Sequence, residues 1–328
     1  MVGNISSEKI DLLVYGPNKP IVDNGFSDQF VLHPAETRAD LDRLSPAVVA
    51  KIRGAAVTYS TARCDSGVMA LFPKLEIVAS FGVGYDHVDA KYASEHKIVV
   101  TNTPDVLTEE VADIALGLLI ATLREFVKAD RYLRSGLWTT QQFPLSVGSL
   151  RDRKVGMVGM GRIGQAIGRR LEASKVPVVY HSRNPAPGVS YKHYPDLIEM
   201  AKAVDTLVVI VPGGPSTAKM VNADVMKALG PRGVIINVAR GSVVDEVAMI
   251  AALKSGAILA AGLDVFANEP AVPDELKAMQ NVVLLPHIGS ASVVTRNAMD
   301  QMVVDNLKTW FAGKPPLTPI AETPVTSR

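Results

Sequence analysis

The glycine spacing of residues 159–164 constrains the fold of this chain more than any other sequence feature. Gly159, Gly161 and Gly164 form a G-x-G-x-x-G pattern directly after the apolar run from Val155 to Val158. Apolar side chains at helical spacing follow, at Ile163, Ala166, Ile167 and Leu171. A strand, a glycine turn and a helix in this order are typical of folds that bind a dinucleotide.

Each glycine has a separate physical reason to be there. Gly159 permits the tight turn from strand to helix, Gly161 lets the backbone approach a pyrophosphate, and Gly164 lets the helix lie close to the strand. The free N–H groups at the start of that helix then hold the phosphates. A glycine-rich turn in another kind of α/β unit is the alternative interpretation.

Short apolar runs alternate with helical patterns along most of the chain, which predicts parallel sheets covered by helices. About 150 residues precede the glycine pattern and contain four of the candidate strands, so a separate α/β domain is expected ahead of it. The length of 328 residues also favours two domains. The candidate strands are 11–15, 56–60, 77–81, 98–101, 155–158, 178–181, 206–211, 234–238, 260–264 and 282–285.

Composition excludes several classes of function. The net charge of +1 leaves no excess positive field for nucleic acid or an anionic membrane. The longest apolar run, Ile114 to Leu123, is too short to span a bilayer. The single cysteine, Cys64, indicates a reducing compartment, and the N-terminal sequence has no signal-peptide pattern, so a cytoplasmic protein is expected.

Three further segments have their own predictions. Thr108 is expected to cap a long, buried helix whose first turn carries Glu109 and Glu110. The segment from Ser135 to Leu150 lacks helical or strand periodicity, and a loop of this length is usually functional, for example as an arm that contacts a second subunit. The tail from Gly313, rich in proline and threonine, is expected to be poorly ordered.

Ligands of open parallel sheets bind beyond the carboxyl ends of the strands. Three loops after late candidate strands each supply one polar residue of a different type: Arg240, Glu269 and His287. Taken singly, each could be a surface charge or a structural loop residue. Taken together, they predict a catalytic set. The other histidines lack this placement and are interpreted as structural or solvent-facing: His33, His87, His96, His181 and His193.

At this point the chain resembles the D-isomer-specific 2-hydroxyacid dehydrogenases, most closely their glyoxylate and hydroxypyruvate reductase branch. The motifs that carry the resemblance extend over nearly the whole chain: SFGVGYDHVD, TNTPDVLTEEVAD, the glycine pattern, VPGGPSTAKMVN, INVARGSVVDE, GLDVFANEP and LLPHIGSAS. The resemblance implies that Arg240, Glu269 and His287 are the catalytic residues. It also implies an NAD(P) cofactor and a homodimer.

The chemistry of 2-oxo acid reduction leads to the same roles. The reaction needs a hydride for the carbonyl carbon, a proton for its oxygen and a group that binds the carboxylate. Histidine can hold a transferable proton near neutral pH, and a neighbouring carboxylate orients its ring, so His287 is the predicted acid and Glu269 its partner. The guanidinium fork of Arg240 can bind a carboxylate and polarise the adjacent carbonyl.

The resemblance also supplies the predicted architecture: two Rossmann-like or flavodoxin-like parallel-sheet domains separated by an active-site cleft. Residues 1–100 with 289–328 would form the substrate-binding domain, and residues 101–288 the dinucleotide-binding domain. A helix from about Ser292 to Phe311 would return the chain to the first domain.

Two sets of ligand contacts follow, and the resemblance is what implies the roles of Thr108, Pro212, Ala239, Asp264, Val83 and Gly84. The predicted cofactor contacts are Thr108, Gly159, Met160, Gly161, Arg162, Ile163, Gly164, Ser182, Arg183, Val211, Pro212, Val238, Ala239, Arg240, Asp264 and His287. Asp264 would lie near the nicotinamide amide. The predicted substrate contacts are the backbone N–H groups of Val83 and Gly84, and the side chains of Arg240, His287, Ser290 and Trp138, the last from the dimer partner. No metal is predicted.

The end of the strand at Val178 to His181 predicts which dinucleotide binds. Members of this fold that use NAD carry an acidic side chain there, which would repel a 2′-phosphate. Here the position falls on Ser182, followed by Arg183, and both can interact with phosphate. NADPH is therefore the predicted cofactor. The alternative is that Arg183 is a solvated loop charge and either cofactor is accepted.

Substrate and function leave alternatives open. The resemblance implies small, polar 2-oxo acids such as glyoxylate and hydroxypyruvate as substrates, and the Ser290 hydroxyl could bind a hydroxymethyl group. Hydroxyphenylpyruvate or another 2-oxo acid is the alternative substrate. An alternative of another class is a dinucleotide-sensing co-repressor that uses the same fold as a binding module.

Overall fold

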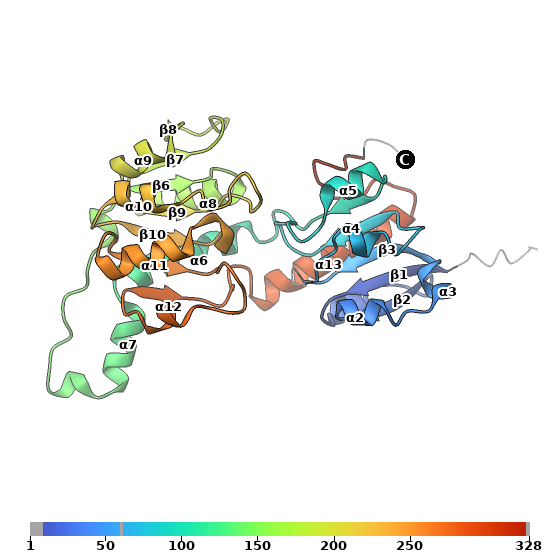
Figure 1. The fold of residues 1–328 in the computed structure, drawn as a ribbon, viewed down its shortest axis with the longest axis horizontal. Helices are drawn as coiled ribbons and strands as arrows, with labels where there is room; N and C mark the ends of the chain where they lie inside the picture. The colour runs from blue at the N-terminus through green and yellow to red at the C-terminus, as the bar shows by residue number, and fades with distance from the viewer. Residues whose placement is uncertain (1–8, 60–61, 326–328) are drawn as a thin grey trace, which may run out of the picture. The chain divides into compact units, whose positions relative to one another are not determined.

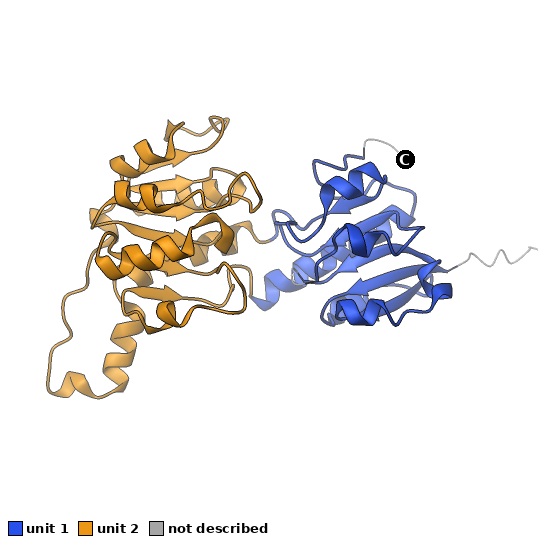
Figure 2. Ribbon diagram, viewed as in Figure 1, with its two compact units in different colours: residues 1–106, 292–328 blue, residues 107–291 orange. Residues whose placement is uncertain are grey.

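The computed structural model describes residues 9–59 and 62–325. The chain forms two compact units, shown in Figure 2: unit 1 comprises Met1–Val106 and Ser292–Arg328, and unit 2 comprises Leu107–Ala291. The divisions expected from sequence lie at residues 100 and 288, so the structure assigns residues 101–106 to unit 1 and residues 289–291 to unit 2.

Unit 1 contains a five-stranded parallel sheet in the order β2-β1-β3-β4-β5 (Figure 1). This order is that of flavodoxin-like folds. The interior strands are largely apolar because helices cover both faces of a parallel sheet. The strands are β1 (Ile10–Tyr15), β2 (Phe30–Ala35), β3 (Ile52–Val57), β4 (Ile77–Ser80) and β5 (Val99–Thr101).

The described residues of unit 1 form five short helices and one long helix. The long helix α13 packs against β3 and β4 and begins after Ser292, whose hydroxyl accepts from the N–H of Thr295. Cys64 is buried in this unit, and its burial, with a smaller effect of Asp65, raises the pKa of the thiol to about 12. The helices are α1 (Pro20–Asn24), α2 (Arg38–Leu41), α3 (Pro46–Val49), α4 (Ser66–Met69), α5 (Ala90–Glu95) and α13 (Val293–Phe311).

The C-terminal tail was predicted to be poorly ordered. Its described part, which ends at residue 325, instead makes specific hydrogen bonds within unit 1. The N–H of Ile320 donates to the carbonyl of Val100, and the N–H of Val100 donates to the hydroxyl of Thr323. Ile320 and Thr323 are both buried. The prediction from composition was wrong for these residues, because the tail forms hydrogen bonds along the edge of β5 that has no neighbouring strand.

Unit 2 contains a seven-stranded parallel sheet in the order β12-β11-β10-β9-β6-β7-β8. The strand order reverses between β6 and β9, which is the arrangement of the doubly wound dinucleotide-binding fold. The strands are β6 (Val155–Val158), β7 (Val178–His181), β8 (Lys192–Tyr194), β9 (Thr206–Val209), β10 (Val234–Asn237), β11 (Ala260–Leu263) and β12 (Val282–Leu284).

The long helix expected at Thr108 is α6, and seven of its residues are buried. Its N-cap is Leu107, without a side-chain cap, so Thr108 is the first helical residue and the predicted cap was wrong. The helical elements of unit 2 are α6 (Thr108–Leu123), α7 (Phe126–Arg134), α8 (Arg162–Ala173), α9 (Leu197–Ala203), α10 (Ala223–Leu229), α11 (Glu246–Ser255), α12 (Asp274–Ala278), and the 3-10 turns η1 (Leu137–Thr139), η2 (Leu150–Asp152) and η3 (Gly241–Val243). Among the described residues, no helix is both long and apolar enough to cross a membrane.

Residues 126–147, named the arm here, extend away from the sheet of unit 2 as α7 and the loop after it (Figure 1). The arm holds seven of the eleven large apolar side chains that are exposed in the described part of the chain: Phe126, Val127, Leu133, Leu137, Trp138, Leu145 and Val147. Such a concentration of exposed apolar surface is typical of an interaction site.

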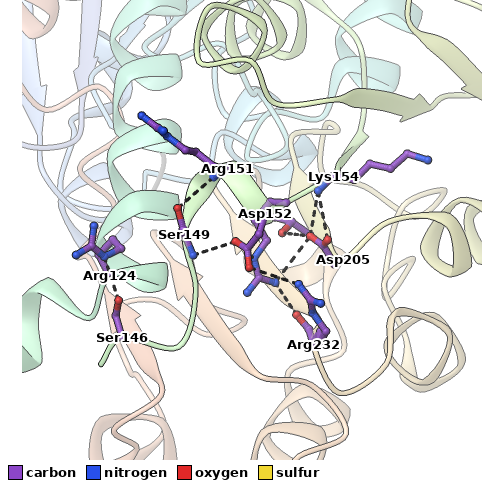
Figure 3. A network of polar contacts seen from close by, with 10 residues as sticks. Arg124, Ser146, Ser149, Arg151, Asp152, Lys154, Asp205 and Arg232 are labelled. Atoms are coloured by element: carbon purple, nitrogen blue, oxygen red, sulfur yellow. Dashed lines mark hydrogen bonds and ion pairs between the residues drawn. The ribbon is translucent and has the colours of Figure 1, made fainter. Parts of the chain in front are cut away.

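A polar network fixes the chain where it returns from the arm to the sheet (Figure 3). The N–H of Ser149 donates to Asp152, and the guanidinium of Arg232 donates to the other oxygen of that carboxylate. The buried guanidinium of Arg153 donates to the carbonyl of Arg232 at 2.7 Å. The N–H of Lys154 donates to Asp205. The root of the arm is therefore held firmly while its apolar residues face solvent.

Candidate active site

The three predicted catalytic residues lie in loops that follow three adjacent strands of unit 2. Arg240 follows β10, Glu269 follows β11 and His287 follows β12. These strands are neighbours and parallel, so their carboxyl ends meet at one edge of the sheet. The loops thereby bring side chains far apart in sequence to the same edge.

Glu269 and His287 form a direct pair. Oε2 of Glu269 lies 2.7 Å from Nδ1 of His287, and Oε1 accepts the N–H of Phe266 at 3.0 Å. Because Nδ1 faces the carboxylate, Nε2 lies on the opposite side of the ring and is the nitrogen available for proton transfer. His287 has a φ of 55°, a left-handed conformation that is uncommon for a residue with a side chain and that occurs preferentially at functional sites.

The surroundings of Glu269 favour its ionised form. Burial alone would raise the pKa of this carboxyl, but the hydrogen bonds from His287 and Phe266, together with the charges of His287 and Arg240, lower it below the ordinary value. An ionised Glu269 can keep the His287 ring in one orientation.

The loop of Arg240 lies in close backbone contact with the loop of Glu269. A Cβ placed on Gly241 would overlap the carbonyl group of Phe266, so only glycine fits at this position. The guanidinium of Arg240 donates from Nη1 to the carbonyl of Ala239 at 2.8 Å. The charge of Arg240 is also one of the causes that lower the pKa of Glu269, so the two side chains interact electrostatically.

Asp264 connects the end of β11 to the loop of His287. Its buried carboxylate accepts the N–H groups of Ile288 at 2.7 Å and Gly289 at 2.8 Å. Burial raises the pKa of Asp264 despite these two bonds, which act in the opposite direction. A cofactor contact was predicted for Asp264 from its sequence motif, whereas these bonds to the segment that follows His287 were not predicted.

The glycine loop has the geometry expected for binding phosphate. Gly159 has a φ of 109°, and a Cβ there would lie 2.7 Å from the carbonyl oxygen of Ile210. A Cβ on Gly164 would lie 2.6 Å from the carbonyl oxygen of Gly159, so the helix lies close to the strand. Gly161 is the N-cap of α8, and a Cβ there would meet no heavy atom within 4 Å. The start of α8 is therefore open to a bound phosphate group.

Ser182 and Arg183 follow β7, on the same edge of the sheet as the glycine loop. The Ser182 hydroxyl donates to the carbonyl of Asn184, and its own carbonyl lies 2.9 Å from Nε2 of His193. Arg183 is exposed, and within the described residues it has no hydrogen-bond or ion-pair partner. The guanidinium is therefore available to an external anion.

In unit 1, the loop after β4 contains the predicted substrate contacts Val83 and Gly84. The loop is held by the side chain of Asn102, which donates to the carbonyl of Val83, and by the hydroxyl of Thr103, which accepts the N–H of Gly82. The N–H groups of Val83 and Gly84 donate to no other described residue. Two adjacent backbone donors of this kind suit an anionic oxygen.

The remaining predicted contacts are distributed over unit 2. Met160, Val238 and Ala239 are buried, whereas Arg162 and Pro212 are exposed. Ser290 follows Gly289 in the loop after β12 and is partly exposed. Trp138 lies in the arm, in η1, with 65% of its surface exposed. The other partly buried positions are Ile163 and Val211, and Thr108 begins α6.

A nucleotide-binding sheet with a carboxylate–histidine pair and an arginine beyond its strand ends defines a dinucleotide-dependent oxidoreductase. Residues 116–289 match the family model described as the NAD binding domain of the D-isomer specific 2-hydroxyacid dehydrogenases. The chain is 45% identical to glyoxylate/hydroxypyruvate reductase A HPR2 of Arabidopsis thaliana, over 95% of this chain and 99% of that protein. It is 43% identical to hydroxyphenylpyruvate reductase of Plectranthus scutellarioides, over 95% of this chain and 99% of that protein.

Solved structures agree with these similarities. The NADPH-dependent glyoxylate/hydroxypyruvate reductase of Sinorhizobium meliloti, crystallised with NADP and malonate, is 53% identical and superimposes with a TM-score of 0.91 over 98% of this chain and 99% of that chain. The chain belongs to the D-isomer specific 2-hydroxyacid dehydrogenase family. It is a dehydrogenase whose unit 2 binds a nicotinamide dinucleotide.

Proposed function

We propose that this dehydrogenase reduces small, polar 2-oxo acids such as glyoxylate and hydroxypyruvate to 2-hydroxy acids, with NADPH as the preferred hydride donor. The observation that carries the proposal is the 2.7 Å pair between Glu269 and His287, with the charge of Arg240 acting on it, at the carboxyl edge of the nucleotide-binding sheet. The names of the similar reductases from Arabidopsis thaliana and Sinorhizobium meliloti support the substrate class.

The residues present fit a dinucleotide. The open space beside Gly161 and the N-terminus of the twelve-residue helix α8 suit a pyrophosphate. When bound, the reduced nicotinamide supplies the hydride. The residues proposed to hold the cofactor are Gly159 to Gly164, Thr108, Ser182, Arg183, Val211, Pro212, Val238, Ala239 and Asp264.

His287 is the proposed general acid. In its protonated state, Nε2 donates a proton to the carbonyl oxygen of the substrate as negative charge develops on that oxygen. Glu269 accepts from Nδ1 throughout, which fixes the ring and stabilises the imidazolium before transfer. After transfer the neutral ring keeps Nδ1–H toward Glu269 and regains a proton on Nε2 from solvent.

Arg240 is the proposed carboxylate clamp. Its planar fork can donate two parallel hydrogen bonds to the substrate carboxylate and polarise the neighbouring carbonyl. The N–H groups of Val83 and Gly84 are proposed as further donors to that carboxylate, and the hydroxyl of Ser290 as a donor to the hydroxyl of hydroxypyruvate. These groups orient the substrate without taking part in proton transfer.

The preference for NADPH is proposed from the residues after β7. Ser182 is neutral where NAD-binding members of this fold carry a carboxylate, and the adjacent Arg183 is exposed without a described partner. A guanidinium in this position can pair with a 2′-phosphate. The structure of the Sinorhizobium meliloti relative in complex with NADP supports this proposal.

A homodimer is proposed from the arm. Its apolar side chains are too exposed for a stable monomer surface, with Leu145 at 97% and Trp138 at 65% exposure. Because the root of the arm is fixed by the network of Arg153, the arm can present these residues to a second copy of the chain at little further cost in conformational entropy.

A second candidate substrate is hydroxyphenylpyruvate, since the chain is nearly as similar to a hydroxyphenylpyruvate reductase as to a glyoxylate/hydroxypyruvate reductase. The deciding experiment measures kcat/KM for a panel of 2-oxo acids with NADPH and with NADH. We expect glyoxylate or hydroxypyruvate with NADPH to give the highest value. A preference for hydroxyphenylpyruvate would support the second candidate, and dinucleotide binding without turnover of any 2-oxo acid would indicate a sensor.

A further inference from the structure

Asn237, the last residue of β10, is a buried polar residue that the reaction scheme above does not use. The three residues before it in the strand are apolar, and Asn237 itself is 1% exposed. A carboxamide removed from water must be hydrogen-bonded, because an unsatisfied amide in the interior is costly. Its two hydrogen bonds therefore show what this side chain does in the structure.

Both bonds go to the short turn that carries Arg240. Oδ1 of Asn237 accepts the N–H of Ala239 at 3.1 Å, and Nδ2 donates to the carbonyl of Arg240 at 3.1 Å. The first contact is an Asx-turn, in which the side chain replaces a backbone carbonyl. One carboxamide thus fixes the peptide group between residues 238 and 239 and the peptide group between residues 240 and 241.

The same turn is fixed from its other side. Gly241 packs directly on the backbone of Phe266, where no Cβ fits, and the N–H of Val243 donates to the carbonyl of Arg240 at 3.2 Å. The Arg240 backbone is extended, with φ of −144° and ψ of 146°, so it lies outside the following 3-10 turn. Because of these contacts the Arg240 Cα has little freedom to move. The side chain that carries the guanidinium is therefore attached at a fixed position.

We propose that Asn237 is a positioning residue that sets the guanidinium of Arg240 for binding the substrate carboxylate. This inference rests on the proposed role of Arg240. Asn237 has no proposed contact with substrate or cofactor and acts only through the N–H of Ala239 and the carbonyl of Arg240. If the Arg240 guanidinium is already oriented before the substrate binds, substrate binding does not have to reorient this side chain.

The test compares Asn237→Ala and Asn237→Ser with wild type on the best 2-oxo acid. Alanine removes both bonds, so we expect KM for the 2-oxo acid to rise by about 10-fold or more, kcat to fall less, and the Kd for NADPH to stay near wild type. Serine can form a related turn with its hydroxyl, so Asn237→Ser should recover part of the lost kcat/KM.

Asn306 supplies a matched control in unit 1. It is also fully buried, with Nδ2 donating to Met302 and Oδ1 accepting the N–H of Thr318, and it has no proposed part in the reaction. Asn306→Ala should lower Tm while leaving the KM for the 2-oxo acid unchanged. A wild-type KM in both Asn237 variants, or an equal rise of KM in Asn306→Ala, would overturn the inference.

A double mutant separates this inference from the proposed function. If Asn237 acts through Arg240, Asn237→Ala should lower kcat/KM much less in the Arg240→Lys background than in wild type. If the two losses in kcat/KM were fully additive, the positioning role of Asn237 would be contradicted, while the proposed role of Arg240 would be unaffected. Wild-type kcat/KM in Arg240→Lys itself would instead contradict the proposed role of Arg240, whatever the Asn237 variants show.

Discussion

Oε2 of Glu269 lies 2.7 Å from Nδ1 of His287, and the two residues are supplied by neighbouring loops 18 residues apart in sequence. The carboxylate is itself held, because Oε1 accepts the N–H of Phe266. Asp264 holds the next two residues after His287 by their N–H groups. The imidazole is therefore fixed through both its ring and its backbone, with Nε2 as the nitrogen left for the substrate.

Arg240→Lys tests the carboxylate clamp. Lysine keeps the positive charge but loses the planar fork, so we expect the KM for the 2-oxo acid to rise and kcat to fall, with a combined loss of about 10- to 100-fold in kcat/KM. Steady-state kinetics at saturating NADPH measures both parameters. Unchanged values would exclude a bidentate contact by Arg240.

Cofactor preference is tested at Ser182 and Arg183. Arg183→Ala should reduce the preference for NADPH over NADH by about 10- to 100-fold, the range expected for one hydrogen bond to a charged group. Ser182→Asp should penalise NADPH more than NADH because a carboxylate repels a 2′-phosphate. The measurement is kcat/KM for both cofactors in wild type and in each variant. A wild-type enzyme that prefers NADH would show that the residues after β7 were misinterpreted.

The arm predicts a dimer at micromolar concentration. Leu145→Glu combined with Leu137→Glu should weaken self-association by at least about 10-fold, because charges would be buried in an apolar interface. Val247 is an exposed apolar residue outside the arm, at 77% exposure, so Val247→Glu is the control and should leave the dimer intact. Analytical ultracentrifugation separates these results, and a fully active wild-type monomer would contradict the prediction.

The lowered pKa of Glu269 predicts a pH dependence of stability. The ordinary value is 4.5, and the folded value lies below it, so the folded state favours the ionised carboxylate. This contribution is fully present above about pH 4.5 and is lost as the pH falls through the folded pKa. The Tm advantage of wild type over Glu269→Gln should therefore shrink as the pH falls below about 4.5. A difference that instead grows below this pH would contradict the assigned direction.

Much of the fold could be predicted from the sequence because interior parallel strands are continuous apolar runs. The run from Val234 to Ile236 is of this kind, and it lies in β10 as expected. The strands β2 and β8 were missed, and both lie at sheet edges, where one side of the strand has no partner. β2 contains Pro34 and β8 is a three-residue strand with an exposed lysine, so neither has the apolar pattern of an interior strand.

The predicted catalytic side chains could be located because parallel topology brings strand ends together. The supporting contacts could not be predicted, since they join side chains to backbone groups of distant loops. Asp264 binds the N–H groups of residues 288 and 289, and Gly241 packs on Phe266, across more than twenty intervening residues in each case. Asn237 was accessible in principle, because an asparagine ending an apolar strand is typical of an Asx-turn.

His287→Ala tests the central claim most directly. The measurement pairs turnover of the best 2-oxo acid with the Kd for NADPH, determined by nicotinamide fluorescence on the same preparation. Loss of the general acid should lower kcat by about 100-fold or more while the Kd stays near the wild-type value. Full turnover in His287→Ala, with the dinucleotide still bound, would show that the proton comes from another group and that the proposed catalytic set is wrong.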